Sequence, residues 1–214
     1  MVKITWRGHA CFVLTSEKGV RVATDPYDAS VGYPMHPFSA DAVLMTHGHH
    51  DHCCRDLLRG EPVIIQTPGE HDACGVRVTG FESWHDDRQG ALRGPNMLYL
   101  IEMDGVRILH AGDLGEAISA DTLARIGHVD VLMIPVGGTY TLTGPQAAEV
   151  ARALSAAVTI PMHYRASCVQ YPLTDEQPFL TAMHAADAPH CAALEVTAHN
   201  VQTLPRVIVM DWEE

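Results

Sequence analysis

The sequence predicts an α/β protein whose sheets are covered by helices. Short strand-like runs separated by turns fill the first half, and strands alternate with helices in the second, a pattern typical of sheets with helices packed on them. The chain has 214 residues, of which 47% are hydrophobic and 19% charged, as in ordinary globular proteins. This length fits one compact domain that spans residues 1–214.

The first half is expected to consist of short strands, because apolar and β-branched residues form runs that turn residues interrupt. The expected strands cover residues 3–6, 11–15, 20–24, 42–45, 63–66 and 76–79. Residues 16–19 are expected to form a hairpin-like connection. Residues 27–39 contain Gly32, Pro34 and Pro37 without periodicity, which predicts a loop.

The second half is expected to alternate between strands and helices. The expected strands are residues 97–102, 106–110, 131–136, 158–161, 193–197 and 206–210, and the expected helices are 119–126, 144–154 and 175–186. Asp104-Gly105 lies between two apolar runs and is a strong hairpin signal. Ser119 and Thr174 are the expected N-caps, and Gly127 is the expected stop of the first helix.

The acidic balance excludes several classes of partner. With 26 acidic and 14 basic residues the formal net charge is −12, which argues against a nucleic-acid surface and against docking on anionic lipid. No apolar run reaches the ~18 residues that a membrane helix needs, and the first residues are typical of a strand, not of a signal peptide. We therefore expect a cytoplasmic protein with free thiols, in which Cys53-Cys54 begins a helix.

The most informative segment is Thr46-His47-Gly48-His49-His50-Asp51-His52, directly after an expected strand. Imidazole nitrogens and carboxylate oxygens are the ligands that zinc and neighbouring metals accept. Gly48 allows the backbone to turn so that the side chains converge. The segment therefore predicts a metal site.

Three more potential ligands follow strand-like runs further along the chain. His85 and Asp113 each come just after such a run, and His163 follows the apolar residues 158–162. Because open α/β sheets place their sites beyond the carboxyl ends of strands, these residues are expected to share one edge with the histidine-rich segment.

Together these motifs resemble the metallo-β-lactamase superfamily. The H-x-H-x-D-H block, the later His85, the Gly112-Asp113 pair and the late His163 follow that family's ligand motifs in order, and Gly8-His9 and Thr24-Asp25-Pro26 are similar to its opening motifs. The chain most resembles a branch of small metal-dependent hydrolases, near the ascorbate-6-phosphate lactonase type. The resemblance implies a four-layer αββα sandwich.

The resemblance also implies a ligand set for two divalent metal ions, with Zn2+ expected first and Mn2+ or Fe2+ as alternatives. His47, His49 and His85 would hold the first ion, Asp51, His52 and His163 the second, and Asp113 would bridge them. Asp51 is also expected to take part in catalysis. Asp25 would orient a ligand histidine from behind.

Other residues have two interpretations at this point. His110 could donate a proton or form a structural hydrogen bond, and His9 could support the site or the fold. Tyr140 is expected to stabilise an oxyanion, and Arg93 and Arg165 to bind a substrate anion. The remaining histidines are expected to be ordinary: His36, His50, His71, His128, His184, His190 and His199.

These expectations favour a binuclear hydrolase in which a metal-bridging hydroxide attacks a small ester, lactone or phosphoester. Two dications outweigh the carboxylates that bind them, so an acidic protein can still take an anionic substrate. A phosphodiesterase or nuclease with the same centre is one alternative, and a non-hydrolytic iron redox or sensing protein is another. The partner is expected to be a small molecule, without nucleic acid or membrane. The sequence leaves the oligomeric state open.

Overall fold

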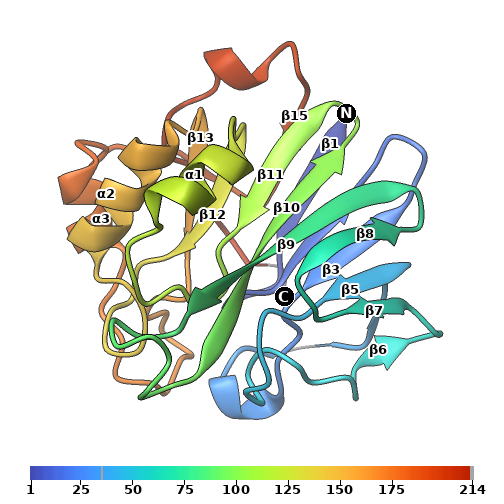
Figure 1. Ribbon diagram of the computed structural model, residues 1–214, viewed down its shortest axis with the longest axis horizontal. Coiled ribbons are helices and arrows are strands. Elements are labelled where there is room, and N and C mark those ends of the chain that lie inside the picture. Colours follow the sequence, from blue (N-terminus) through green and yellow to red (C-terminus); the bar gives the residue numbers. More distant parts are fainter. Residues whose placement is uncertain (35, 213–214) are drawn as a thin grey trace.

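Two six-stranded sheets form the centre of the computed structural model, which describes residues 1–34 and 36–212 (Figure 1). The first sheet has the order β15 (Ala193–Val196), β1 (Val2–Trp6), β2 (Phe12–Thr15), β3 (Arg21–Thr24), β5 (Ala42–Leu44) and β7 (Val63–Ile65). The second has the order β13 (Val158–Met162), β12 (Val131–Pro135), β11 (Val106–His110), β10 (Pro95–Met103), β9 (Val76–Trp84) and β8 (Gly69–Ala73).

Strand direction brings four carboxyl ends of the second sheet to one edge. β11, β12 and β13 run parallel, and β9 has the same direction because β10 lies antiparallel between β9 and β11. In the first sheet β3, β5 and β7 also run parallel. The segments that leave these strands carry the expected ligands, so the topology assembles them as the sequence predicts.

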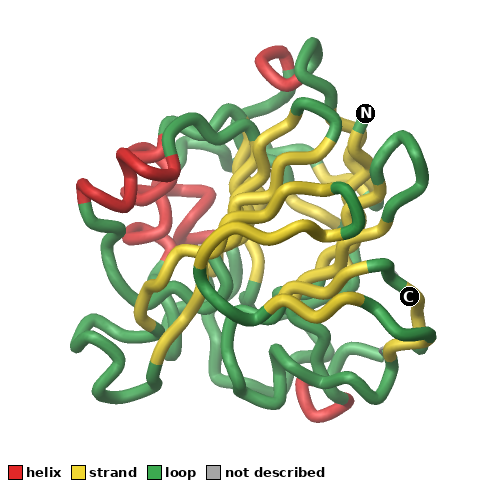
Figure 2. The backbone as a smooth tube through the Cα atoms, turned by 45° about the vertical axis from the view of Figure 1, so that its right-hand side comes forward, coloured by secondary structure: helices red, strands yellow, loops and turns green. Residues whose placement is uncertain are grey.

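The helices α1 (Ala120–Ile126), α2 (Gly144–Leu154) and α3 (Gln177–Ala182) lie together beside the second sheet (Figures 1 and 2). Every residue of β12 and β13 is buried, as expected for parallel strands covered on both faces. The Ser119 hydroxyl accepts the Thr122 N–H at 3.1 Å, which confirms the predicted cap of α1. This packing is an α/β sandwich.

Two predicted elements are too long. The helix expected over 175–186 is α3, only Gln177–Ala182, with Glu176 and not Thr174 at its N-cap; beyond it His184 adopts a left-handed φ of 54° that a helix cannot continue through. The strand expected over 206–210 is only β16 (Val209–Met210), which pairs with β14 (His190–Cys191).

The structure also adds short elements to the segments around the site. The expected loop 27–39 contains the 3-10 turn Ala29–Val31 and ends in β4 (Phe38–Ser39), which pairs with β6 (Leu58–Arg59). The helix expected at Cys53-Cys54 is wrong: the chain there is irregular, and the Cys54 N–H donates to the carbonyl of Pro26. Among the described residues, no helix has the length and apolar character needed to cross a bilayer.

Candidate metal centre

The predicted ligands meet at the edge where the strands end. His47, His49, Asp51 and His52 come from the segment after β5. In the second sheet, His85 and His163 directly follow β9 and β13, and Asp113 lies three residues after the end of β11. Their potential ligand atoms form overlapping groups within 4.8 Å of one another: His47, His49 and His85; His47, His52 and Asp113; His9, Asp51, His52 and His163.

Asp113 lies at the centre of these groups. Its Oδ2 is 3.0 Å from His85 Nε2, 3.2 Å from His52 Nε2, 3.3 Å from His163 Nε2 and 3.9 Å from His47 Nε2. Burial raises the pKa of Asp113, but His163 and His52 outweigh that effect and hold it well below its usual value. The carboxylate is therefore ionised and faces imidazole nitrogens on several sides.

Buried polar atoms without partners show that the residues fit a metal. Within the described residues, His47 Nε2, His52 Nε2 and Asp113 Oδ1 are buried and lack a hydrogen bond. Unpaired buried polar atoms are costly, and a divalent cation would satisfy all of these. Burial and the neighbouring His52 lower the pKa of His47 to about 3, so that ring is neutral and can donate a lone pair to a cation.

The Asp25 carboxylate lies behind His52. Its Oδ2 accepts a hydrogen bond from His52 Nδ1 at 3.0 Å, which leaves His52 Nε2 free to face Asp113. The Thr46 backbone N–H donates to Asp25 Oδ1 and the Thr46 hydroxyl to Asp25 Oδ2, both at 2.8 Å. Burial lowers the pKa of His52, but Asp113 and Asp25 on either side outweigh it and raise that pKa well above its ordinary value. The space between the Asp25 and Asp113 carboxylates therefore favours a positively charged group.

His110 lies behind Asp25. Its Nε2 is 2.9 Å from Asp25 Oδ2, its side chain is fully buried, and it is absent from the lining of the adjoining cavity. Of the two interpretations that the sequence leaves open, this position favours a hydrogen bond that holds Asp25.

Asn96 is a supporting residue that the sequence analysis missed. Its Oδ1 accepts the Asp113 N–H at 2.9 Å, and its Nδ2 donates to Ser83 Oγ and to the Ala111 carbonyl. A Cβ on Gly112, whose φ is 54°, would lie 2.4 Å from Asn96 Oδ1, so this approach requires glycine. The only signal in the sequence was a polar residue at the start of an apolar run.

Comparisons with known proteins relate the chain to metal-dependent hydrolases. A beta-lactamase superfamily domain matches residues 3–163. The UPF0173 metal-dependent hydrolase of Thermoplasma acidophilum is 32% identical over 189 residues, 76% of this chain and 83% of that protein. That of Archaeoglobus fulgidus is 29% identical over 208 residues, 83% of this chain and 87% of that protein.

One solved structure is similar to this chain over the whole length of both proteins. A metallo-beta-lactamase superfamily protein from Thermotoga maritima is 35% identical, covers 100% of both chains and superposes with a TM-score of 0.82. This chain belongs to the metallo-β-lactamase superfamily. Within it, the chain is a metal-dependent hydrolase related to the UPF0173 proteins. The finer resemblance to the ascorbate-6-phosphate lactonase type stays a prediction.

A cavity of about 320 Å³ lies beside the candidate metal centre of this chain. It is lined by His49, His50, Asp51, His85, Arg93, Asp113, Tyr140, His163 and Tyr171. Arg93 Cζ lies 5.6 Å from the ring centroid of Tyr140, and Tyr171 packs against that ring at 6.3 Å. One cationic and two phenolic side chains thus share the cavity with the potential ligands; Tyr171 was not foreseen from the sequence.

The structure brings Arg93 and Tyr140 to the cavity but not Arg165. The Arg165 guanidinium pairs with Asp175 Oδ2 at 2.9 Å and lines a separate hollow beside Trp6. Arg165 therefore lies outside the cavity: its backbone N–H pairs with the carbonyl of Thr174, and its side chain pairs with Asp175. Its expected role in substrate binding stays a prediction. His50 is exposed at the cavity rim and pairs with Asp28 at 3.2 Å.

Proposed function

We propose that the chain is a binuclear hydrolase of small esters, lactones or phosphoesters that carry an anionic group. The observation that carries the proposal is the Asp113 carboxylate, which lies between two sets of histidines with its Oδ2 at 3.0 Å from His85 and 3.3 Å from His163. An ionised carboxylate in this position suits two cations that share one bridging ligand.

The donor set favours zinc, because neutral imidazoles and carboxylates are its usual non-sulfur ligands. His47, His49 and His85 would hold one ion, Asp51, His52 and His163 the other, and Asp113 both. Two divalent ions bound there would supply hydroxide near neutral pH and polarise the carbonyl or phosphoryl oxygen of the substrate.

The remaining polar groups of the cavity bind and orient the substrate. Arg93 donates one hydrogen bond to the Thr139 carbonyl at 3.1 Å, which fixes its guanidinium while other N–H groups stay available for an anion. The Tyr140 hydroxyl is the proposed donor to the developing oxyanion. Burial raises the pKa of Asp51, but the neighbouring His9 and His52 outweigh it and lower that pKa, so Asp51 enters the reaction as a carboxylate.

Metal analysis and a substrate panel test the proposal. The chain, loaded with Zn2+, Mn2+ or Fe2+, is assayed on esters, thioesters, lactones, a phosphomonoester and a chromogenic phosphodiester. We expect two metal ions per chain and turnover of an ester, a lactone or the phosphomonoester. Turnover of the phosphodiester alone would instead establish a phosphodiesterase. Iron with a visible spectrum and no hydrolysis would establish a redox or sensing protein.

A pair of arginine variants tests the anionic group of the substrate. Arg93→Gln is expected to lower kcat/KM about 10- to 100-fold, because a hydrogen bond to a charged group contributes about 1.5–3 kcal/mol. The matched control is Arg165→Gln, whose guanidinium lies outside the cavity. Equal activity of the two variants would contradict the assignment of Arg93.

A further inference from the structure

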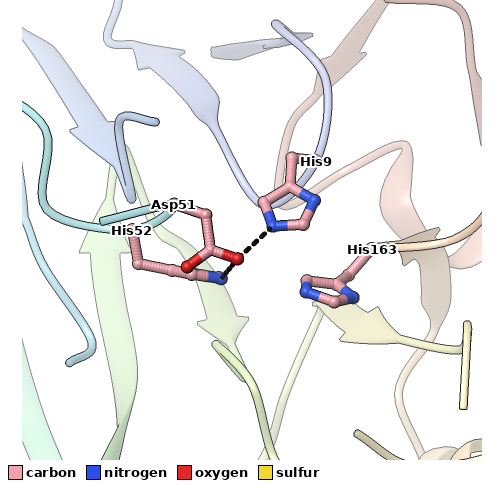
Figure 3. Close-up of side chains that lie close together, drawn as sticks. All are labelled: His9, Asp51, His52 and His163. Carbon is pink, nitrogen blue, oxygen red and sulfur yellow. Dashed lines mark hydrogen bonds and ion pairs between the residues drawn. The ribbon is translucent and has the colours of Figure 1, made fainter. Parts of the chain in front are cut away.

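We infer that His9 is a fourth side-chain ligand of the second metal site, beside Asp51, His52 and His163. The inference rests on the proposed function, because it assumes that two ions bind. The sequence left His9 between a supporting role and a structural one. Figure 3 shows the Asp51 carboxylate between the rings of His9 and His52, with the His163 ring beside His9.

The distances around His9 are those of ligands that share one ion. His9 Nε2 lies 3.3 Å from Asp51 Oδ2. Ligand atoms of His9, Asp51, His52 and His163 all lie within 4.8 Å of one another. Two donors that each lie about 2.1 Å from a tetrahedral ion are about 3.4 Å apart. A charge-assisted hydrogen bond would be shorter, about 2.7–2.9 Å, so the separation favours a shared ion over a direct bond.

The backbone holds His9 in this place at a cost. His9 has a φ of 53°, a left-handed conformation that costs a residue other than glycine free energy and is concentrated at functional sites. Its carbonyl accepts the His163 N–H at 3.1 Å and the Trp6 indole N–H at 3.0 Å. His163 itself has a φ of 52°. The two strained histidines are therefore locked to each other through the main chain.

A fourth ligand makes the two metal sites unequal. The second site would have four side chains of its own, and the rings of His9, His52 and His163 are each no more than 1% exposed. The first site has three, and His49 is exposed at the cavity. We therefore expect the second site to retain its ion more tightly, and the first to exchange its ion through the cavity.

Metal titration tests the inference without reference to activity. Metal-free wild type, His9→Ala, His9→Gln and the control His50→Ala are titrated with Zn2+ against a chromogenic chelator. We expect two equivalents in the wild type and in the control. In both His9 variants the affinity of the tighter site should fall more than about 100-fold, the upper end of the loss caused by removing an outer partner of a ligand.

The two variants at His9 separate ligation from hydrogen bonding. The amide N–H of glutamine can still donate to Asp51, so near-wild-type affinity in His9→Gln alone would overturn the inference in favour of a hydrogen bond. Wild-type affinity in both variants would also overturn it. Fewer than two equivalents in the wild type would instead refute the proposed binuclear function. Melting curves of the metal-free chains check that every variant folds.

Discussion

At the scale of single residues, the site depends on groups that hold other groups in place. Asp25 fixes His52 through Nδ1, and Asn96 fixes the main chain of Asp113. Such outer contacts determine which nitrogen or oxygen of a ligand faces the metal, and their loss weakens metal affinity or activity by about 10- to 100-fold. Variants of ligands and of their supports should therefore behave differently.

Asp113→Asn removes the charge that lies among the ligand histidines. Asp113 Oδ2 is within 3.9 Å of four imidazole nitrogens, so we expect one ion or none per chain. We also expect activity to fall by more than about 100-fold, beyond the usual cost of losing an outer partner. Metal content and kcat/KM measure both effects. Asp175→Asn, at the exposed pair with Arg165, is the control; two ions and normal activity in Asp113→Asn would contradict the bridging role.

His110→Gln distinguishes a positioning role from proton donation. If His110 acts only through Asp25, the variant should bind metal about 10- to 100-fold more weakly. Its kcat and pH profile should be normal once metal is saturating. His128→Gln, whose exposed ring pairs with Asp130, is the matched control. A low kcat with two ions bound would show that His110 takes part in the chemistry.

At the scale of elements, the sequence predicts the helices and strands whose bounds are set by neighbouring residues. β11 and α2 have their predicted bounds, because a hairpin turn precedes the first and an alanine-rich run defines the second. β8 was missed because Gly69–Ala73 is mostly polar and becomes a strand only by pairing with β9. The ligand motifs were predictable for the same reason, since each lies next to its strand in sequence.

The cavity wall was less predictable than the ligands. Tyr171 comes from a segment without periodicity, and only the folded chain brings it to Tyr140 and Arg93. Arg165 lies two residues after the proposed ligand His163. Its side chain nevertheless pairs with Asp175 and lines a hollow other than the cavity. Contacts between loops from distant parts of the sequence produce no residue spacing from which they could be predicted.

The loop after β9 is held by one buried carboxylate, Asp86. Its oxygens accept backbone N–H groups at 2.7–3.0 Å from Arg88, Gly90, Leu92 and Arg93. Burial raises the pKa of Asp86, but these donors outweigh it and lower that pKa. The stabilisation of the loop is therefore complete at neutral pH, and it is lost as the pH falls through the lowered pKa.

Asp86→Asn places an amide N–H group against backbone donors, so the loop that carries Arg93 should open more often. We expect amide hydrogen exchange at residues 88–93 to become at least about 10-fold faster at neutral pH, with unchanged metal content. Asp87→Asn, at the exposed neighbour, is the control. In the wild type, the protection of these amides relative to their intrinsic exchange rate should fall as the pH drops through the lowered pKa of Asp86. Unchanged exchange in Asp86→Asn would show that other contacts hold the loop.

At the scale of the whole molecule, the site joins the two sheets. Asp25 follows a strand of the first sheet and His110 ends a strand of the second, and they meet at 2.9 Å. The Tyr99 hydroxyl of β10 also donates to the carbonyl of Met45, just after β5. The ligands divide between the sheets in the same way, so bound metal would tie both sheets together.

Removal of metal should therefore lower the stability of the whole chain. A ligand that binds only the folded state stabilises it by about 2.7 kcal/mol at 100 times its Kd and about 4.1 kcal/mol at 1,000 times. At about 2–4 °C per kcal/mol for a chain of this size, Tm should fall on the order of 10 °C with a chelator and recover with Zn2+. Calorimetry measures the shift, and Asp113→Asn should show much less of it. Equal Tm values for loaded and metal-free wild type would mean that the ions do not link the sheets.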